Sequence, residues 1–175
     1  ESDSSGYIIL DPTAYPTAYG HLDRIVNSIL ESGQVKHKDD FVWRTRIIKD
    51  DSTLNAFCAP GGYIYVFTGI IKYLDSEDQL AGVLGHEIAH ADRRHSTDQL
   101  TKQYGYSFLL SAILGDSNAL SQVATGLILL QYGRDNESEA DEYSVRYLCP
   151  TTYNAAGGAG FFEKIVPAEK EIDPA

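Results

Sequence analysis

The stretch LAGVLGHEIAHA, residues 80–91, decides how this chain folds and what chemistry it can support. It contains two histidines four positions apart, His86 and His90, with Glu87 directly after the first. On a helix, residues with this spacing share one face, with Cβ atoms about 6 Å apart, so both imidazoles can bind one zinc ion at about 2.0–2.1 Å. Glu87 is rotated about 100° from His86. It flanks such an ion without having to ligate it, and it can take a proton from a water molecule that the ion activates.

The residues around this motif are small and apolar, which indicates that its helix lies in the interior. Residues 80–85 precede the first histidine, and Ile88 and Ala89 stand between the two. Buried histidines and a buried glutamate need polar partners, because an unpaired polar group in an apolar interior is costly. A zinc centre supplies such a partner, and it explains the segment better than an ordinary helix that carries two histidines.

The size and charge of the chain limit its class. Its 175 residues, of which 43% are hydrophobic, are enough for a single catalytic domain over residues 1–175. The net charge of −11 disfavours nucleic acid and anionic membrane as partners. The sequence contains no run of 18 or more apolar residues, so we expect no integral membrane segment in this chain.

The pattern of apolar residues and turn signals predicts a mixed fold. Residues 1–16 lack periodicity and are expected to form an irregular N-terminal arm. Strands are predicted at residues 41–48, 55–59 and 63–67. Helices are predicted at residues 19–30, 70–74, 76–94, 96–114, 118–132, 134–149 and 154–166. Strands followed by helices indicate an α+β fold, in which a small three-stranded sheet borders a mainly helical body.

Two histidines leave a catalytic zinc ion one protein ligand short. A third histidine six residues after His90 would complete one type of site, but Ser96 stands there. Asp92 lies on the same rigid helix as the histidines and cannot swing to the metal. The remaining candidate is Glu137, on the separate helix predicted at 134–149. An ordinary acidic helix start, favoured by the helix dipole, is the competing interpretation of that segment.

Spacing on this later helix gives its acidic residues different positions. Glu137 and Asp141 are four residues apart and share one face. Glu137 can ligate zinc while Asp141 accepts a hydrogen bond from the other ring N–H of a ligating histidine, which orients the ring and raises its basicity. Glu139 points about 200° away from Glu137, so we expect it to lie in solvent.

These segments together resemble the HtpX/CAAX-prenyl-protease type of zinc metallopeptidase, a gluzincin family that combines HExxH with a glutamate on a later helix. The resemblance extends over most of the chain, from about residue 18 to residue 164. It also includes the strand–turn–strand at residues 55–69, the Arg94–His95 pair after the motif, and the tyrosine-rich turn and helix at residues 153–164.

The resemblance implies a zincin-like fold and a site built from the residues already singled out. One zinc ion per chain would be held by His86, His90 and Glu137, and Asp141 would accept a hydrogen bond from a ligating histidine. Glu87 would act as the general base. The implied function is that of a zinc-dependent endopeptidase that hydrolyses peptide bonds of extended or unfolded proteins.

We expect the substrate to bind as an added strand on an edge of the small sheet, through backbone hydrogen bonds that depend more on shape than on sequence. The strand predicted for this role consists of Tyr63, Ile64, Tyr65, Val66 and Phe67. Two other functions stay open. One is a latent or weakly active zinc-containing module that binds peptides as a chaperone does. The other is a purely structural metal site, which would need a fourth protein ligand without a clear candidate.

Two departures from the family pattern bear on location and catalysis. Membrane-embedded members carry transmembrane helices, whereas this chain is more similar to the soluble periplasmic branch. We therefore expect a periplasmic or otherwise extracytoplasmic bacterial protein whose signal segment is absent from this chain. Family members also carry a histidine downstream of the last helix, but no histidine follows His95 here. The sequence therefore leaves both Arg134 and the tyrosines as candidates for the group that stabilises the transition state.

The remaining histidines and the cysteines have no motif around them. His21 and His37 are expected at the surface. His95 lies about 140° off the ligand face of a continuous helix and is expected to be structural. Cys58 and Cys149 can form one disulfide or stay as two thiols, and the sequence leaves both possibilities open.

Overall fold

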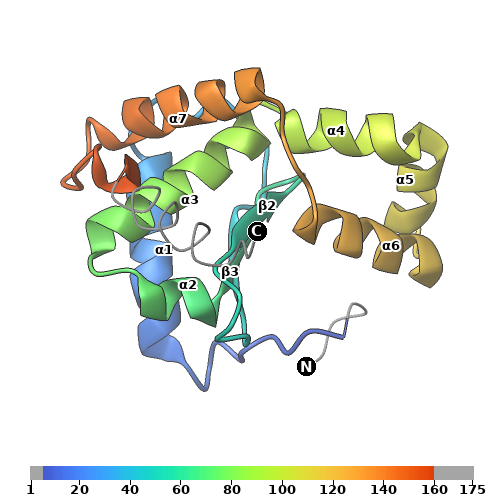
Figure 1. The fold of residues 1–175 in the computed structure, drawn as a ribbon, viewed down its shortest axis with the longest axis horizontal. Coiled ribbons are helices and arrows are strands. Elements are labelled where there is room, and N and C mark those ends of the chain that lie inside the picture. The colour runs from blue at the N-terminus through green and yellow to red at the C-terminus, as the bar shows by residue number, and fades with distance from the viewer. Residues whose placement is uncertain (1–5, 160–175) are drawn as a thin grey trace, which may run out of the picture.

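The computed structural model describes residues 6–159 and has the predicted α+β fold, with one small mixed sheet and a mainly helical body (Figure 1). In this view α1, α3 and α7 lie on one side of the strands and α4 to α6 on the other. The elements, in chain order, are α1 (Pro16–Leu30), β1 (Arg44–Ile48), β2 (Ala56–Ala59), β3 (Tyr63–Phe67), α2 (Thr68–Tyr73), α3 (Glu77–Asp92), α4 (His95–Tyr104), α5 (Tyr106–Ile113), α6 (Ser117–Ile128) and α7 (Arg134–Leu148).

The helix α1 packs one apolar face into the core. Leu22, Ile25 and Ile29 are spaced by three or four residues and are almost completely buried. The helix begins at Pro16, three residues before the predicted start. Proline suits this position because its ring holds φ in the helical range and its missing N–H is not needed in the first turn.

The strand order in the sheet is β1–β3–β2, so β3 is the central strand. It pairs in parallel with β1, and it forms an antiparallel hairpin with β2 through a turn in which Gly61 and Gly62 have positive φ. The prediction that Tyr63–Phe67 is an edge strand is therefore wrong. This strand has partners on both sides, and its residues Ile64 and Val66 are fully buried.

The two outer edges of the sheet have different surroundings. The N-terminal arm runs along the edge of β1, where Leu10 N–H donates to Ile47 C=O at 2.9 Å and Ile9 pairs with Ile48. The strand β2 is the other outer strand, and among the helices it contacts mainly α3. Among the described residues, β2 is thus the strand whose edge borders the HExxH helix.

The helix α3 carries the HExxH motif through the middle of the molecule. Ser76 caps it, since its side-chain oxygen accepts a hydrogen bond from Gln79 N–H at 3.3 Å. Its second half is buried nearly all round, as the small apolar residues of the motif predict. Gly85 lets α7 approach closely, because a Cβ atom there would lie 2.7 Å from Ser144 Oγ.

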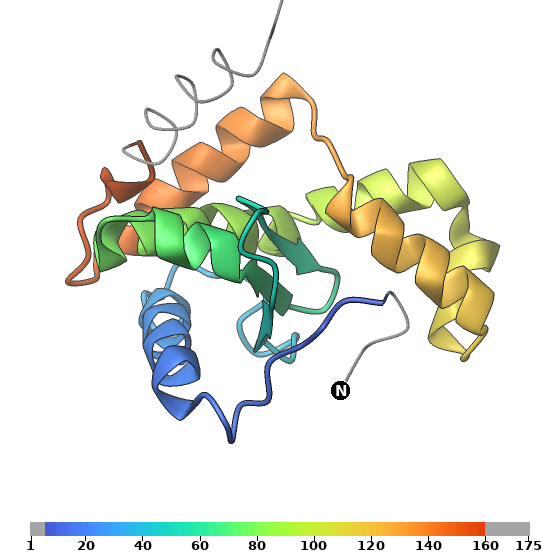
Figure 2. The ribbon, with the colours of Figure 1, turned by 60° about the horizontal axis from the view of Figure 1, so that its bottom comes forward.

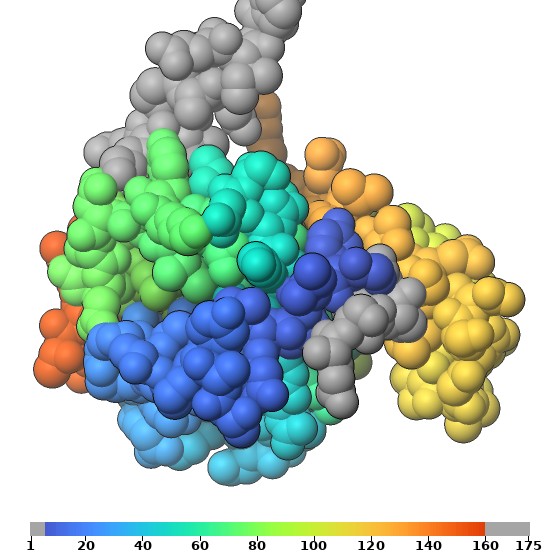
Figure 3. Space-filling view, turned by 90° about the horizontal axis from the view of Figure 1, so that it is seen from below, coloured from blue at the N-terminus to red at the C-terminus, as the bar shows by residue number. Residues whose placement is uncertain are grey.

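The chain after α3 forms a lobe of three helices, α4 to α6, which stands to one side of the body (Figures 2 and 3). Arg94 adopts a left-handed conformation, with φ of 66°, and separates α3 from α4. Gly105, with φ of 80°, divides the helix predicted at 96–114 into α4 and α5, because a residue in the left-handed region ends a helix. The helix predicted at 154–166 lies mostly outside the described residues. No helix within residues 6–159 combines the length and apolar character that crossing a membrane requires.

Candidate metal centre

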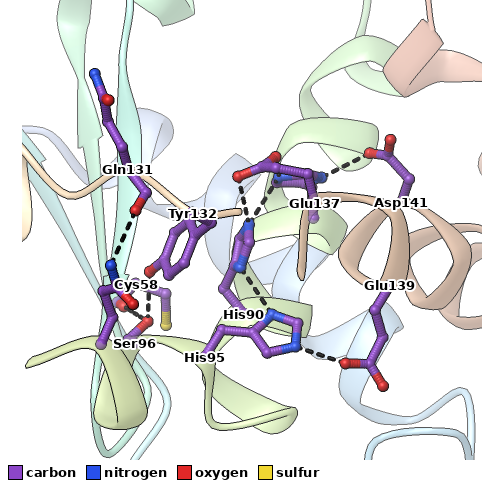
Figure 4. A network of polar contacts seen from close by, with 11 residues as sticks. Cys58, His90, His95, Ser96, Gln131, Tyr132, Glu137, Glu139 and Asp141 are labelled. Atoms are coloured by element: carbon purple, nitrogen blue, oxygen red, sulfur yellow. Dashed lines mark hydrogen bonds and ion pairs between the residues drawn. The ribbon is translucent and has the colours of Figure 1, made fainter. Parts of the chain in front are cut away.

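Two buried side chains of α3 and one partly exposed side chain of α7 converge at one place (Figure 4). The Nε2 atoms of His86 and His90, both from α3, are 3.0 Å apart. The carboxylate oxygens of Glu137, from α7, lie 3.2 Å from His86 Nε2 and 3.6 Å from His90 Nε2. Within residues 6–159 this is the one group of three His, Cys, Asp or Glu side chains whose ligand atoms all lie within 4.8 Å of one another.

The spacing of these atoms fits a zinc ion. Ligand atoms about 2.0–2.2 Å from a tetrahedral ion lie about 3.3–3.6 Å from one another, which is close to the three separations observed. Two imidazoles and one carboxylate are also a donor set that catalytic zinc sites use, with one position left for water or substrate. The structure thus brings together the three residues that the sequence singles out.

The two histidines have opposite tendencies to bind a proton. Burial opposes protonation of His86, but a hydrogen bond to Glu137 and the charges of Glu87, Glu137 and Asp141 outweigh it and raise its pKa to about 9. Burial, together with the charges of His86 and His95, lowers the pKa of His90 to about 2. The surrounding carboxylates therefore favour a positive charge at this place.

The helix α7 delivers two carboxylates by packing closely against α3. Ser144 Oγ donates a hydrogen bond to Gly82 C=O at 3.1 Å, which sets the rotation of α7 about its axis. Residues four apart on α7 then face α3 together, and these are Glu137 and Asp141. Asp141 Oδ1 lies 2.8 Å from His86 Nδ1, the ring nitrogen directed away from the cluster.

His90 has a different partner on the far side of its ring. Its Nδ1 lies 3.0 Å from Nδ1 of His95, whose Nε2 lies 2.6 Å from Oε2 of Glu139. The prediction that Glu139 lies in solvent is wrong, because α3 ends at Asp92 and the turn after it brings His95 and Arg93 against this carboxylate. The hydrogen bond from His95 lowers the pKa of Glu139, and the one from Arg93 adds to this effect.

Glu87 lies on the side of α3 that faces β2. Burial raises its pKa to about 7, although the charge of His86 and a hydrogen bond from the backbone of Cys58 act in the opposite direction. A pKa near the working pH suits a group that both accepts and returns a proton. The position of Glu87 beside the ligand cluster is thus combined with the proton affinity of a general base.

Two residues beside the cluster are missed by the sequence reasoning. Tyr132 stacks on the His90 ring, with ring centroids 3.8 Å apart and 13° between the planes. Its hydroxyl lies 2.8 Å from Ser96 Oγ, which donates a hydrogen bond to Cys58 C=O at 3.2 Å (Figure 4). These contacts join the lobe to the outer edge of β2. The one available signal was that Tyr132 stands two positions before the acidic helix that carries Glu137.

The other histidines and the cysteines divide between surface and interior. His21 is exposed, as predicted, and its Nδ1 lies 3.0 Å from Oε1 of Glu77 in the first turn of α3. The prediction of a surface position is wrong for His37, whose side chain is 15% exposed and lies 3.1 Å from Asp92 Oδ1. Cys58 is buried and Cys149 is exposed, and the two are not paired.

Comparison with known proteins places this site in a family. The model of Peptidase family M48 matches residues 16–166, which is most of the chain. The chain belongs to peptidase family M48. Members of this family are metal-dependent peptidases, so the resemblance to HtpX-type metallopeptidases is confirmed.

Several curated proteins are similar to this chain over most of its length. The mitochondrial metalloendopeptidase OMA1 of Schizosaccharomyces pombe is 32% identical over 168 residues, which cover 94% of this chain and 48% of that protein. The metalloprotease YcaL of Escherichia coli is 27% identical over 173 residues, which cover 94% and 64%. A putative beta-barrel assembly-enhancing protease of Vibrio cholerae is 30% identical over 129 residues, which cover 66% and 27%. The chain thus spans about half or less of the length of the OMA1 proteins that it matches.

Proposed function

We propose that this chain is the catalytic part of a zinc-dependent endopeptidase and holds one zinc ion. The observation that carries the proposal is the convergence of His86, His90 and Glu137 beside the partly buried carboxylate of Glu87. Membership of family M48 supports a metal-dependent peptidase. The choice of zinc rests on the donor set of two imidazoles and one carboxylate.

Each residue of the cluster has a distinct task in this proposal. His86, His90 and Glu137 would hold the ion, and Asp141 would keep the His86 ring in its binding orientation. Zinc bound there supplies a Lewis acid that polarises the scissile carbonyl and lowers the pKa of water. Glu87 would take a proton from the attacking water molecule and return it to the leaving amine.

We place the substrate along β2, in place of the β3 position predicted from the sequence. Phe67 N–H donates to Asn55 C=O at 3.2 Å, so the backbone groups of Asn55 and of alternate residues after it face β3. The backbone groups of Ala56 and Cys58 therefore face the outer edge, beside α3. An extended peptide would add a strand at this edge, through backbone contacts that depend little on its sequence. This supports extended or unfolded proteins as substrates.

One observation favours a latent or weakly active peptide-binding module as the second candidate. Ser96 already donates a hydrogen bond to Cys58 C=O on the outer edge of β2, and Tyr132 covers one face of His90. A peptide that pairs along the whole strand has to displace the Ser96 hydroxyl from Cys58 C=O and the Glu87 carboxylate from Cys58 N–H. The group that stabilises the transition state is not assigned. The Tyr132 hydroxyl is hydrogen-bonded to Ser96, and the Arg134 side chain is exposed at the start of α7.

We further propose that residues 1–175 act as one catalytic domain in a bacterial periplasm or another extracytoplasmic compartment. Matches to beta-barrel assembly-enhancing proteases of Yersinia pestis and Escherichia coli support this location, whereas the OMA1 relatives are named as mitochondrial. Fractionation of cells that make the tagged protein, with marker enzymes for each compartment, tests the location. Recovery with the cytoplasmic markers would contradict it.

Hydrolysis of unfolded casein by the zinc-loaded protein tests the function. Glu87→Gln should lose at least about a hundredfold in rate and keep its zinc and its circular dichroism spectrum, because the amide is nearly isosteric with the carboxylate. Glu142→Gln, which changes an exposed carboxylate on α7, is the matched control. If Glu87→Gln cleaves as fast as the parent, Glu87 is not the base. If the parent binds zinc and casein but does not hydrolyse the casein, the peptide-binding module explains the site better.

A further inference from the structure

We propose that His95 and Glu139 are positioning residues for His90, and that they form a chain that determines which ring nitrogen of His90 carries the proton. The inference rests on the proposed metal site and extends it to residues outside the ligand set. The two histidine ligands are supported in different ways. His86 has the Asp141 carboxylate directly at its Nδ1, whereas His90 has a second imidazole at the same position.

When His90 ligates a metal through Nε2, one arrangement of protons satisfies every contact between His90, His95 and Glu139. His90 Nε2 faces His86 and Glu137 and has to offer a lone pair to a metal, so the proton of His90 is on Nδ1. This N–H donates to His95 Nδ1 at 3.0 Å, so neutral His95 carries its own proton on Nε2. That Nε2–H donates to Glu139 Oε2 at 2.6 Å. A doubly protonated His95 would place two N–H groups against each other.

Glu139, at the end of this hydrogen-bonded series, is held in place by the positive charge of Arg93. Arg93 donates a hydrogen bond from Nε to Glu139 Oε1 at 3.0 Å, and its guanidinium lies over the Tyr143 ring at 4.4 Å from the centroid. An ionised carboxylate can only accept hydrogen bonds, so Glu139 requires an N–H from His95. Glu139 thus requires a proton on Nε2 of His95, and neutral His95 then accepts at Nδ1 from His90.

The backbone between the two histidines makes this contact possible. On a continuous helix, His95 would lie about 140° around the axis from His90. The helix α3 ends at Asp92 instead, and Arg94 in its left-handed conformation turns the chain so that His95 begins α4. His95 is 4% exposed, so water does not compete strongly for its ring nitrogens. The contact of His90 with neutral His95 thereby favours the metal-binding tautomer of His90.

Zinc affinity, measured by competition with a chelator, tests the hydrogen-bonded series His90–His95–Glu139 without a measurement of peptide hydrolysis. We expect His95→Phe and Glu139→Ala each to weaken zinc binding about 10–100-fold. His95→Gln should recover most of the affinity, because an amide can accept from His90 and donate to Glu139. The double variant should bind no more weakly than the weaker single variant, because both residues act through one chain. Glu142→Ala on the exposed side of α7 is the matched control.

A second measurement separates positioning from folding. Nitrogen-15 spectra of the imidazole rings in the zinc-loaded parent should show His90 protonated at Nδ1 and His95 protonated at Nε2. Glu139→Gln keeps the side-chain volume and replaces Glu139→Ala if that variant does not fold. Its loss of zinc affinity should lie between that of the parent and that of Glu139→Ala.

Four outcomes would overturn or separate the two proposals. Unchanged affinity in both His95→Phe and Glu139→Ala, or equal losses in His95→Phe and His95→Gln, would overturn the chain. A parent that holds no zinc would overturn both the chain and the peptidase. If the variants show the predicted changes in zinc affinity but the zinc-loaded parent leaves casein intact, the role of His95 and Glu139 is supported and only the peptidase activity is contradicted.

Discussion

Glu87 and His86 are neighbours on α3, and their proton affinities are raised for different physical reasons. The Glu87 carboxylate lies against the backbone of Cys58, and burial raises its pKa from 4.5 to about 7. His86 keeps a raised pKa in spite of burial, because carboxylates surround it. The glutamate therefore responds to desolvation and the histidine to charge. A cation between the rings would favour the ionised form of the glutamate.

We expect the contribution of Glu87 to the stability of the metal-free protein to fall as pH rises from 4.5 to about 7, whereas His90, whose pKa is lowered, contributes a change of opposite sign. The folded state binds the Glu87 proton more tightly than the unfolded chain does. Its contribution to the free energy of unfolding is therefore complete below the unfolded pKa of 4.5 and is lost as pH rises through about 7. Glu87→Gln removes this titration, so the free energy of unfolding of the variant should rise relative to that of the parent as pH increases through this window. Denaturant unfolding with a chelator present measures both proteins, and equal slopes would contradict a raised pKa of Glu87.

Asp141→Ala should weaken zinc binding without removing a ligand. Loss of such a contact typically lowers metal affinity about 10–100-fold. Asp141 is 61% exposed, so water can replace part of its contact with His86, and we expect the lower half of that range. Asp135→Ala, in the exposed first turn of the same helix, is the matched control. An affinity that stays the same in chelator competition would mean that Asp141 does not orient His86.

At the scale of elements, the site depends on how closely α3 approaches its neighbours. Gly85 faces Ser144 of α7, and a Cβ atom at Gly82 would meet the backbone of Gly158. Neither glycine has positive φ, so lack of space makes glycine necessary here. Both lie within about one turn of His86. A displacement of α3 at these points would therefore move the ligand histidines relative to α7.

Gly82→Ala should lower the free energy of unfolding by about 1–3 kcal/mol. The added Cβ would lie 2.2 Å from Gly158 N, and a backbone atom cannot rotate away as a side chain can. Gly20→Ala is the matched control, because Gly20 lies on the exposed face of α1 with no atom within 4 Å of the added Cβ. It should raise the free energy of unfolding by up to about 1 kcal/mol. Denaturant unfolding compares the two, and a Gly82→Ala variant as stable as the parent would show that residues 157–159 do not pack on α3.

At the scale of the whole molecule, Asp92 joins three parts of the chain that are distant in sequence. Its carboxylate accepts hydrogen bonds from Lys36 N–H at 3.1 Å, from His37 N–H at 2.7 Å and from the Tyr147 hydroxyl at 2.6 Å. Burial, together with the hydrogen bond to Asp92, raises the pKa of Tyr147 well above its usual value. One side chain thus connects the end of α3, the loop between α1 and β1, and α7.

Asp92→Ala should cost about 2–4 kcal/mol in the free energy of unfolding, because several buried donors lose their acceptor together. Tyr147→Phe removes one of these hydrogen bonds and should cost about 1 kcal/mol. Thermal and denaturant unfolding of both variants measure the difference. Equal costs in the two variants would mean that the contacts with Lys36 and His37 contribute little.

Much of the site follows from spacing within one helix or one hairpin. The pairs His86–His90 and Glu137–Asp141 share a helix face because the α-helical repeat alone requires it. The hairpin at residues 55–67 follows from two adjacent strand patterns and the Gly-Gly turn between them. These relations hold in almost any surrounding fold. For that reason the metal-binding motif, the candidate third ligand and the α+β class could be predicted from the sequence.

Contacts between distant segments were decided only by the tertiary structure. The parallel pairing of β1 with β3 passes over β2, and no local pattern indicates which of two apolar strands will be central. Glu139 meets His95 because the chain turns at Arg94, and Tyr132 reaches His90 because the lobe returns to the body. Such contacts are selected by the packing free energy of the assembled elements, which is not a property of any short stretch of sequence.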